Sequence, residues 1–385
     1  MGKVGGLWNF SEDVGTDSSD GLPVHSPIYR NLMTNTPNDL VELPFTDYFK
    51  DEAKYVSWER YLEANNQLAE EYDLYKYIKF YHYIKSVKKL QRGFKLEIKN
   101  TSTNEEFSEE FDFVVVAAGR YNIPKWPKAE NKLLENFAGR YFHSKDIKDT
   151  NLYVNDRVLC IGSGISALDI SLLLHKAGAP NVVINSKLAL FTKYCTHKWA
   201  DNYSMVQSPI KAVDGKKIIF ENGISEEFDT VIACTGYLCE YPFLEPKLRP
   251  ENRTVAFPHL YDAIVHTKYP ELTFVGAFYS FHPKFSSYGQ GHYIANMLNK
   301  NLTNLPSEEE MEKSIEEWYN NLPKEISIIG VVDFHFNYYD HLQTFCPHKI
   351  VSKRHRKYTN HFIPFLLAGK HLEYEHKSLK DFDDS

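Results

Sequence analysis

The order of hydrophobic and polar positions along the chain predicts strands and helices in alternation. Four runs are almost wholly apolar and contain or end in a glycine, which is typical of strands buried on both faces: 111–119, 157–164, 228–236 and 272–278. After the second run, residues 165–178 carry apolar side chains three and four positions apart, which indicates a helix, and 181–187 resembles another short strand. Strand, helix and strand make one βαβ unit, so we expect a parallel sheet in this part of the chain.

The flanking segments follow other patterns. Residues 1–50 are rich in turn-forming residues and are expected to be mostly loop. Helical spacing is found at 55–74, 288–302 and 306–322, and Ser307 is placed to cap the last of these helices. Two strands are predicted at 77–90 and 94–100, and the acidic stretch 101–110 is expected to be a hairpin tip or a surface loop. The tail after residue 331 is mixed and aromatic.

Composition narrows the class of protein. The 385 residues are 43% hydrophobic and 25% charged, which is typical of a globular chain with room for two or three domains. Lys and Arg total 44 against 51 acidic residues, and this net charge of −7 argues against a nucleic acid partner. No run approaches about 18 apolar residues, so no membrane span is expected. The 5 cysteines are too few and too scattered for a disulfide framework, and an odd number favours a reducing compartment.

A glycine motif follows the strand predicted at 157–161. Gly162, Gly164 and Ala167 form a G-x-G-x-x-A sequence between that strand and the next helix. The first glycine permits a tight turn, the second lets the backbone approach a pyrophosphate, and a small sixth residue lets helix and strand pack closely. The free N–H groups at the helix N-terminus would then face the phosphates. The alternative is a glycine turn that packs a helix on a sheet and binds nothing.

The residues after the next strand bear on the choice of coenzyme. That strand ends at Asn185, Ser186 and Lys187. Sites for NAD place an acid there to bind the ribose 2′-hydroxyl, whereas sites for NADP place a cation beside the 2′-phosphate. Ser186 and Lys187 therefore favour NADPH, although a solvated surface lysine is the commoner role for such a residue. Two more strands end at Gly119 and Gly236, and such repeated crossovers beside a Rossmann unit indicate two dinucleotides.

Several further segments, taken in order, have counterparts in one known family. They are Gly5-Gly6-Leu7-Trp8; Tyr29 to Leu32 with Thr34-Asn35-Thr36-Pro37; the signature residues Phe137, Gly139 and His143; Gly162 to Asp169, which includes Ser166, Ala167 and Leu168; Cys234-Thr235-Gly236-Tyr237 with Tyr241 to Leu244; and Gln290 with Tyr293. In this order and spacing, nearly the whole chain resembles the flavin-containing monooxygenases that oxygenate nitrogen and sulfur. Ile147 at the end of the signature and Cys234 in place of alanine depart from the family pattern.

The resemblance implies an α/β fold with two Rossmann-like dinucleotide-binding domains. The FAD domain would be discontinuous, with a first part at 1–153 and a second part at 239–385 that includes a C-terminal helical tail. The NADPH domain, 154–238, would be inserted between them. The cofactor-binding residues that the resemblance implies are Gly5, Gly6, Leu7, Trp8, Thr34, Asn35, Thr36, Gly162, Gly164, Ser166, Ala167, Leu168, Asp169, Ser186, Lys187, Thr235, Gly236, Tyr237 and Gln290.

The implied activity is that of a flavin-dependent monooxygenase of the N,N-dimethylaniline monooxygenase type. NADPH would reduce FAD, the reduced flavin would capture molecular oxygen as a C4a-hydroperoxide, and one oxygen atom would pass to an amine nitrogen or a sulfide sulfur of a small molecule. Asn35 is implied as the catalytic residue, with its amide at the reactive edge of the flavin. Ketone-oxygenating relatives are disfavoured, because their signature ends in tryptophan at the position of Ile147.

Other candidate chemistry has a simpler structural interpretation. We expect His143 to pack the junction between the domains and to take no part in catalysis. Cys234 and Cys239 are spaced like a redox pair, but they flank the glycine linker, so a redox dithiol is disfavoured. The spacing around Cys346 and His348 matches no zinc pattern, and no metal is expected.

The N-terminus departs most from the family. The family opens with a flavin-binding βαβ unit of about 30 residues that carries G-x-G-x-x-G, and Trp8 stands too close to Met1 for such a unit. We therefore expect an N-terminally incomplete chain, and the alternative function is a truncated, inactive remnant that at most binds NADPH. The expected location is the cytoplasm or the endoplasmic reticulum surface, or secretion if the missing segment holds a signal peptide. A homodimer is compatible with the resemblance.

Overall fold

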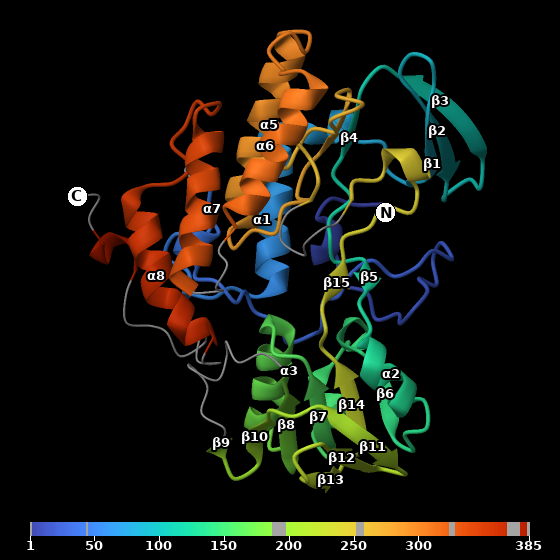
Figure 1. The fold of residues 1–385 in the computed structure, drawn as a ribbon, viewed down its shortest axis with the longest axis vertical. Coiled ribbons are helices and arrows are strands. Elements are labelled where there is room, and N and C mark those ends of the chain that lie inside the picture. Colours follow the sequence, from blue (N-terminus) through green and yellow to red (C-terminus); the bar gives the residue numbers. More distant parts are fainter. Residues whose placement is uncertain are drawn as a thin grey trace.

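Two bodies joined by a pair of short strands make up the fold of this computed structural model (Figure 1). The structure describes residues 2–43, 45–186, 198–251, 258–322, 328–367 and 378–382. The lower body in Figure 1 comprises the described residues of 125–236 and is built around a six-stranded sheet. The upper body comprises the described residues of 2–122 and 239–382 and is rich in helices. This α/β organisation agrees with the fold class that the sequence predicts.

The sheet of the lower body has the strand order β6-β14-β7-β8-β10-β9. Its strands are β6 (Arg140–His143), β7 (Arg157–Ile161), β8 (Asn181–Asn185), β9 (Lys198–Ala200), β10 (Tyr203–Val206) and β14 (Thr230–Ala233). All neighbours pair in parallel except β9, which is antiparallel to β10. In register, Val158 of β7 lies between Thr230 of β14 and Val182 of β8. All four residues of β14 are buried, as the apolar run at 228–236 predicts for a central parallel strand.

Both faces of this sheet are covered. On one face, α3 (Ile165–Lys176) packs Ala167, Leu168 and Leu174, all fully buried, against the strands. On the other face lie α2 (Lys128–Leu134) and a three-stranded antiparallel sheet of β11 (Ile210–Asp214), β12 (Lys217–Phe220) and β13 (Ser225–Glu227). The strand–helix–strand succession of β7, α3 and β8 confirms the βαβ unit that the hydrophobic pattern predicts.

Helices and small sheets form the upper body. Its helices are α1 (Trp58–Glu71), α5 (Pro283–Asn299), α6 (Glu308–Asn320), α7 (Ile328–Gln343) and α8 (Lys353–Leu367). A parallel pair, β4 (Val114–Val116) and β16 (Leu272–Phe274), lies beside them. An antiparallel sheet of β1 (His82–Lys89), β2 (Phe94–Asn100) and β3 (Glu106–Phe111) projects at one corner (Figure 1). The core between the helices is largely aromatic and includes Phe285, Phe336, Tyr338, Tyr339 and Tyr358.

Short 3₁₀ turns connect these elements. They are η1 (Gly6–Trp8), η2 (Asn38–Leu40), η3 (Leu74–Tyr77), η4 (Ser144–Asp146), η5 (Thr150–Tyr153), η6 (Pro246–Leu248) and η8 (Leu379–Asp381). Only these turns and loops occupy the described part of 2–57, which agrees with the loop predicted for the first fifty residues.

A neck of two strands links the bodies. The chain enters the lower body through β5 (Ile123–Pro124) and leaves it through β15 (Tyr237–Leu238), and the two strands pair antiparallel. The lower sheet already begins at β6, ahead of residue 154. The predicted NADPH-domain range of 154–238 therefore covers most of the lower body, while α2 and β6 join it from the preceding segment.

One segment differs from the sequence expectations. The acidic stretch expected as a hairpin tip or a surface loop forms the edge strand β3 from residue 106 onward, where it pairs antiparallel with β2. Lys79 and Lys85 pair with Glu109 and Glu106 on that strand. Charged side chains are a common protection of such edges. The C-terminal helical tail that the resemblance implies is formed by α7 and α8. At α6, Ser307 forms the expected cap, since Ser307 and Glu310 make a reciprocal capping box.

Candidate functional site

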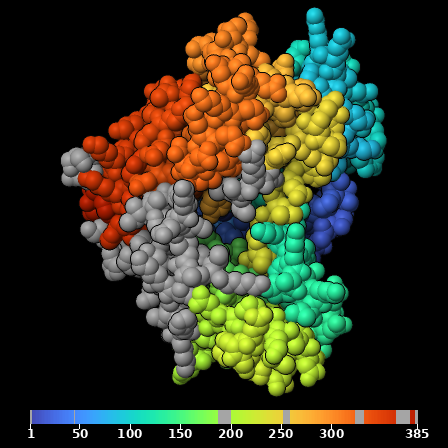
Figure 2. Space-filling view, viewed as in Figure 1, coloured from blue at the N-terminus to red at the C-terminus, as the bar shows by residue number. Residues whose placement is uncertain are grey.

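Glycine crossovers mark the carboxyl ends of four strands. Gly119 follows β4, Gly162 follows β7, Gly236 follows β14 and Gly276 follows β16, with φ angles of 75°, 120°, 78° and 77°. Because β4 leads down into β5 and β14 leads up into β15, the carboxyl ends of both parallel sheets face the neck (Figure 1). Figure 2 shows a hollow between the two bodies at this level. Ligands of open parallel sheets bind at such edges.

The loop between β7 and α3 contains two glycines with different roles. Gly162 has positive φ, and a Cβ atom there would lie 2.9 Å from the carbonyl carbon of Cys234 and closer still to its oxygen. Gly164 has φ −77° and ψ 178°, which any residue adopts, and a Cβ atom there would meet no described atom within 4 Å. The fold therefore requires glycine at residue 162 but not at residue 164. The glycine at residue 164 leaves the space in front of the N-terminus of α3 open.

The start of α3 offers donors to that space. Gly164 is its N-cap and has no side-chain capping bond, while Ile165 and Ser166 are half-buried at the rim. Ala167 and Leu168, the next two residues of α3, are fully buried, and their side chains pack the helix against the sheet. A helix N-terminus with free N–H groups and an open approach fits a phosphate group. The residues present at this edge therefore fit the pyrophosphate of a dinucleotide.

The end of β8 is tied to the same loop. Ser186 donates a hydrogen bond of 2.7 Å to the Ser163 hydroxyl, and both side chains are buried. Gly162 N–H donates to the Asn185 carbonyl at 2.8 Å. The Asn185 Nδ2 donates to the carbonyls of Val206 and Ser208 at 3.0 and 2.7 Å, and its buried Oδ1 accepts no hydrogen bond from the described part of the chain. Lys187, predicted to bind a 2′-phosphate, lies outside the described residues.

Asp169 faces the upper body. Its Oδ2 accepts a short hydrogen bond from the Tyr29 hydroxyl, and both side chains are buried. Burial, together with the negative charge of Asp169, raises the pKa of Tyr29 well above its ordinary value, so the hydroxyl stays protonated and donates. The sequence places Asp169 among the cofactor-binding residues, and the structure shows it bonded to a protein side chain that lies 140 positions away.

His143 occupies the junction between the bodies, as the sequence predicts. Its Nε2 donates to the Gly236 carbonyl at 3.0 Å, and its Nδ1 accepts from the Lys145 N–H at 3.1 Å. Burial lowers the pKa of His143 to about 4, so the ring is neutral at pH 7. A neutral ring with both nitrogens bonded to backbone is suited to holding the junction.

Two buried lysines beside His143 also hold this junction, and the sequence analysis did not identify them. Lys145 Nζ donates to the Asn122 carbonyl at 2.6 Å, and Lys148 Nζ donates to the Ser26 carbonyl at 3.1 Å. Burial lowers the pKa of both side chains. The available signal was the position of the two lysines on either side of the buried Ile147, within the signature segment.

The Gly5 to Trp8 segment is a fixed turn in the upper body. Gly5 and Gly6 have φ angles of 120° and 53°, which glycine adopts without strain. The Gly6 carbonyl accepts from His25 Nε2 at 2.9 Å, and the Leu7 carbonyl accepts from the Ser26 hydroxyl at 2.5 Å. Trp8 stacks on Tyr61 of α1, with ring centroids 4.0 Å apart.

Asn35 has an amide group available for a ligand. Its neighbour Thr34 is fixed to Val56, since Thr34 N–H donates to the Val56 carbonyl at 2.9 Å and Val56 N–H donates to the Thr34 hydroxyl at 3.1 Å. Asn35 is half-buried, and its Oδ1 accepts from the Thr36 hydroxyl at 3.2 Å. Within the described chain its Nδ2 donates to no partner. A side chain with a held carbonyl and an unused N–H suits hydrogen bonding to a bound group.

The remaining predicted residues lie at the neck or behind it. The Thr235 hydroxyl donates to the Lys125 carbonyl, and the Gly236 carbonyl accepts from Lys125 N–H at 2.9 Å. Tyr237 stands edge-on to Tyr121 and His143, with centroids 5.6 and 5.2 Å away.

Gln290 lies deeper, fully buried in α5. Its Oε1 accepts from Gly276 N–H at 2.9 Å, and its Nε2 donates to Tyr338 at 2.9 Å. Both ends of this amide are engaged by protein, so an influence of Gln290 on a ligand would pass through the crossover at Gly276.

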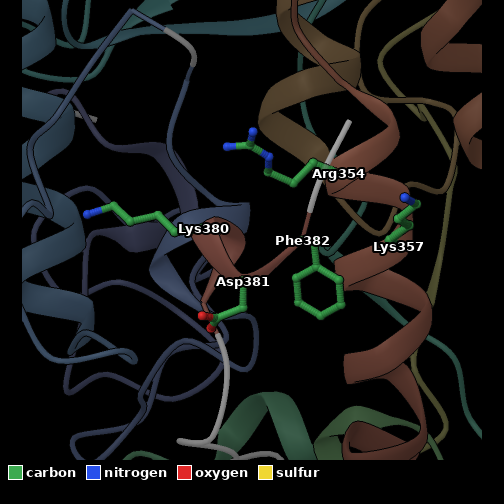
Figure 3. Close-up of a pocket in the computed structure, with 5 residues that line it drawn as sticks. All are labelled: Arg354, Lys357, Lys380, Asp381 and Phe382. Atoms are coloured by element: carbon green, nitrogen blue, oxygen red, sulfur yellow. The ribbon is translucent and has the colours of Figure 1, made fainter. Parts of the chain in front are cut away.

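A cavity of about 400 Å³ opens between α8 and η8 (Figure 3). It is lined by Arg354, Lys357, Lys380, Asp381 and Phe382, none of which belongs to the glycine crossovers. Among the described residues, no group of three or more His, Cys, Asp or Glu side chains is arranged to hold a metal ion. No helix in the described part of the chain is long and apolar enough to span a bilayer.

Comparisons with known proteins give this geometry a context. The family model described as "Flavin-binding monooxygenase-like" matches residues 2–193 and 202–353. The trimethylamine monooxygenase of Pelagibacter sp. (strain HTCC7211) is 28% identical over 388 residues, which cover 98% of this chain and 82% of the relative. The senecionine N-oxygenase of Tyria jacobaeae is 29% identical over 80% of this chain and 67% of the relative.

Solved structures agree with the sequence comparisons. The crystal structure of Tmm from Pelagibacter sp. strain HTCC7211 superposes with a TM-score of 0.85 at 26% identity, over 94% of this chain and 82% of that one. A cyclohexanone monooxygenase, in its open crystal structure, shares the fold alone, with a TM-score of 0.57 at 14% identity over 86% of this chain and 92% of that one. The family match over most of the chain confirms the resemblance: this chain belongs to the flavin-binding monooxygenase-like family and is an enzyme of that type.

Proposed function

We propose that the chain binds FAD and NADPH and transfers one oxygen atom from O₂ to a nucleophilic nitrogen, or to a sulfide sulfur, of a small molecule. The observation that carries the proposal is the space in front of Gly164 at the N-terminus of α3, next to a hollow where two parallel sheets face each other. The family match supports the reaction, and two relatives are named for trimethylamine and for the N-oxygenation of senecionine.

The lower body is the proposed NADPH site. Gly164 leaves room for the pyrophosphate, and the first N–H groups of α3 together with Ser166 would donate to it. Ser186 holds Ser163 and thereby the loop, rather than standing alone at the end of β8. The positive charge of Lys187 supports NADPH over NADH.

The upper body is the proposed FAD site. The residues that would hold FAD are the turn at 5–8, the loop at 34–36 and the crossovers at Gly119 and Gly276, where a Cβ atom would meet no described neighbour within 4 Å. When bound, NADPH supplies a hydride, and the reduced flavin supplies the electrons that activate O₂.

This chain's own residues supply position and exclusion of water. Asn35 directs an unused amide N–H toward solvent or ligand, while Thr36 holds its carbonyl oxygen. His143, neutral and bonded on both sides to backbone, keeps the neck closed around β15 and removes no proton from substrate. A soft nucleophile such as an amine needs no general base, so the site is suited to neutral amines and sulfides.

The test is the reconstitution of the purified chain. After incubation with FAD and removal of the excess, flavin absorbance is measured, followed by NADPH oxidation with trimethylamine or dimethyl sulfide as substrate. We expect bound flavin, substrate-dependent NADPH oxidation and, by mass spectrometry, the N-oxide of trimethylamine or the sulfoxide of dimethyl sulfide. NADPH binding without flavin binding or oxidation would instead support a protein that only binds NADPH. Absence of binding to either cofactor would overturn the proposal.

Location and assembly belong to the same proposal. A reducing compartment, such as the cytoplasm or the surface of the endoplasmic reticulum, is proposed because the 5 cysteines are an odd number scattered along the sequence. A homodimer is proposed by analogy with the family, and light scattering of the purified chain measures it.

A further inference from the structure

A buried hydrogen bond joins the two bodies at a place that the proposed reaction does not yet use. The Tyr29 hydroxyl, in the N-terminal loop of the upper body, donates to Asp169 Oδ2 on α3 of the lower body. Tyr29 is 5% exposed and Asp169 is 6% exposed. A buried carboxylate is costly unless it is hydrogen-bonded, so this contact stabilises one relative placement of the two bodies.

Asp169 stands where a carboxylate works against anion binding. α3 begins at Ile165, and Asp169 therefore lies near the end of the helix that faces the proposed pyrophosphate. A negative charge near that end reduces the attraction of the helix N-terminus for phosphate. Its side chain makes the bond to Tyr29 instead, which gives the carboxylate a role other than holding the coenzyme directly.

The loop that carries Tyr29 is fastened along its length. Arg30 N–H donates to the Lys148 carbonyl at 2.7 Å, which fixes the loop to the junction segment. Two residues further on, the Leu32 carbonyl accepts from Trp58 N–H at 3.2 Å, at the start of α1. Thr34 is paired with Val56, as described above, and Asn35 follows directly. A shift of Tyr29 is therefore transmitted along a short, bonded segment to Asn35.

The Tyr29 hydroxyl also lies close to the neck. Its electrostatic neighbours besides Asp169 are Cys234, at the end of β14, and Tyr237 in β15. One hydroxyl group thus sits where the loop of the upper body, the first turns of α3 and the return strand of the neck meet.

We propose that Tyr29 and Asp169 are positioning residues whose hydrogen bond sets the placement of the α3 loop relative to Asn35. The proposal rests on the proposed function, because alignment of these two groups matters only if the loop holds NADPH and Asn35 faces the flavin. Loss of the bond leaves each binding segment intact but lets the bodies shift. Coupling between NADPH oxidation and product formation should suffer more than coenzyme binding does.

The test uses substitutions that separate packing from placement. Tyr29→Phe removes the hydroxyl and keeps the ring. Asp169→Asn keeps an acceptor oxygen for Tyr29, so its peroxide release and amide exchange should be closer to the wild-type values than those of Tyr29→Phe. The double variant Tyr29→Phe/Asp169→Leu removes both polar groups, so it leaves no buried carboxylate unsatisfied and should recover stability without recovering the bond. Tyr141→Phe is the matched control, since the Tyr141 hydroxyl bonds to Asn131 at 2.9 Å within the lower body.

Three measurements follow on the FAD-loaded full chain: the NADP⁺ dissociation constant, hydrogen peroxide released per NADPH oxidised, and amide hydrogen exchange of residues 29–36 and 165–172. For Tyr29→Phe and the double variant we expect an NADP⁺ dissociation constant within about threefold of the wild-type value. We expect peroxide release per NADPH to rise about fivefold or more, because a small misplacement of the reacting groups steeply lowers the transfer of oxygen to the substrate. Amide exchange should rise at 29–36 and at 165–172 in these two variants, whereas Tyr141→Phe should leave both the exchange and the peroxide release unchanged.

Two results would overturn the proposal. Peroxide release in the double variant equal to that of the wild type would show that the bond serves stability alone. Unchanged exchange at 29–36 in Tyr29→Phe would show that the loop is not held by this contact. The exchange measurement stands even if the wild-type chain oxidises no NADPH, so failure of the proposed function and failure of the tether are distinguished.

Discussion

A Cβ atom on Gly162 would lie 2.9 Å from the carbonyl carbon of Cys234 and closer still to its oxygen. Gly162 also has a φ of 120°, which side chains rarely tolerate. Gly162→Ala should therefore destabilise the lower body by about 2–4 kcal/mol, from backbone strain and overpacking together. Urea unfolding measures the change, and a variant as stable as the wild type would show that β7 and β14 can separate at this point.

Gly164→Val is expected to have the opposite profile. The backbone at residue 164 suits any residue and the added side chain enters open space, so stability should change by no more than about 1 kcal/mol. The valine occupies the proposed place of the pyrophosphate, and NADPH binding should be lost. Isothermal titration with NADPH measures this, with Gly162→Ala as the stability comparison. Tight binding by Gly164→Val would reject the assignment of this loop.

Lys187 is predicted to set the choice of coenzyme. A charge-assisted contact with the 2′-phosphate contributes about 1.5–3 kcal/mol, so Lys187→Ala should raise the NADPH dissociation constant about tenfold or more. NADH lacks that phosphate, and its affinity should stay nearly constant. Both dissociation constants are measured by fluorescence titration. An equal loss for the two coenzymes would assign Lys187 to general packing.

Asn35 is predicted to protect the oxygenating species. Asn35→Ala should still permit NADPH oxidation in the FAD-loaded enzyme, but the oxygen should leave as hydrogen peroxide rather than as product. Peroxide and N-oxide are measured together against NADPH consumed. Asn31→Ala is the control, because Asn31 lies on the same loop but is exposed. Full coupling in Asn35→Ala would remove this role.

His143 should make stability depend on pH. Burial lowers its pKa from 6.5 to about 4 in the folded chain. As pH falls from 6.5 towards 4, the unfolded chain binds a proton that the folded chain does not, and the free energy of unfolding drops by up to about 1.4 kcal/mol per pH unit.

The variant His143→Gln keeps a donor for the Gly236 carbonyl but does not titrate, so its decline in this range should be shallower. Urea unfolding across the range compares the two proteins. His282 and His335, whose pKa values burial lowers to about 3, contribute equally to both curves. Parallel curves would mean that His143 is protonated alike in folded and unfolded chains.

The strands around the glycine crossovers were predictable because their sequences are almost wholly apolar and a glycine lies at or near the end of each run. The cap of α6 was predictable as well, because Ser307 and Glu310 are close in sequence. β3 was not, because its acidic sequence lacks a strand pattern, and its pairing with β2 and the contacts of its glutamates with Lys79 and Lys85 form only on folding. α7 belongs to the helical tail that the resemblance implies, and its period could also have been found, because the buried residues His335, Phe336, Tyr339 and Leu342 are spaced as on one face of a helix.

The candidate site divides in the same way. The loop at 162–167 and the turn at 5–8 are local motifs, and the structure places them as separate, well-defined turns. Two contacts that hold the two bodies together join residues more than a hundred positions apart, namely Tyr29 with Asp169 and Lys148 with Ser26. Neither the spacing of motifs nor hydrophobic periodicity predicts such pairs. The bond of Asp169 to Tyr29, which separates its role from coenzyme binding, could therefore be found only in the structure.

The pairing of β4 with β16 has a consequence for the order of folding. Residues 114–116 meet 272–274 only after the whole lower body has been made. The entropy lost on closing a loop grows with its length, but a folded lower body brings β5 and β15 side by side and shortens the loop to be closed. During synthesis the lower body is complete before β16 leaves the ribosome, so we expect it to fold first. A substitution at its core would then slow the formation of a sheet that it never touches.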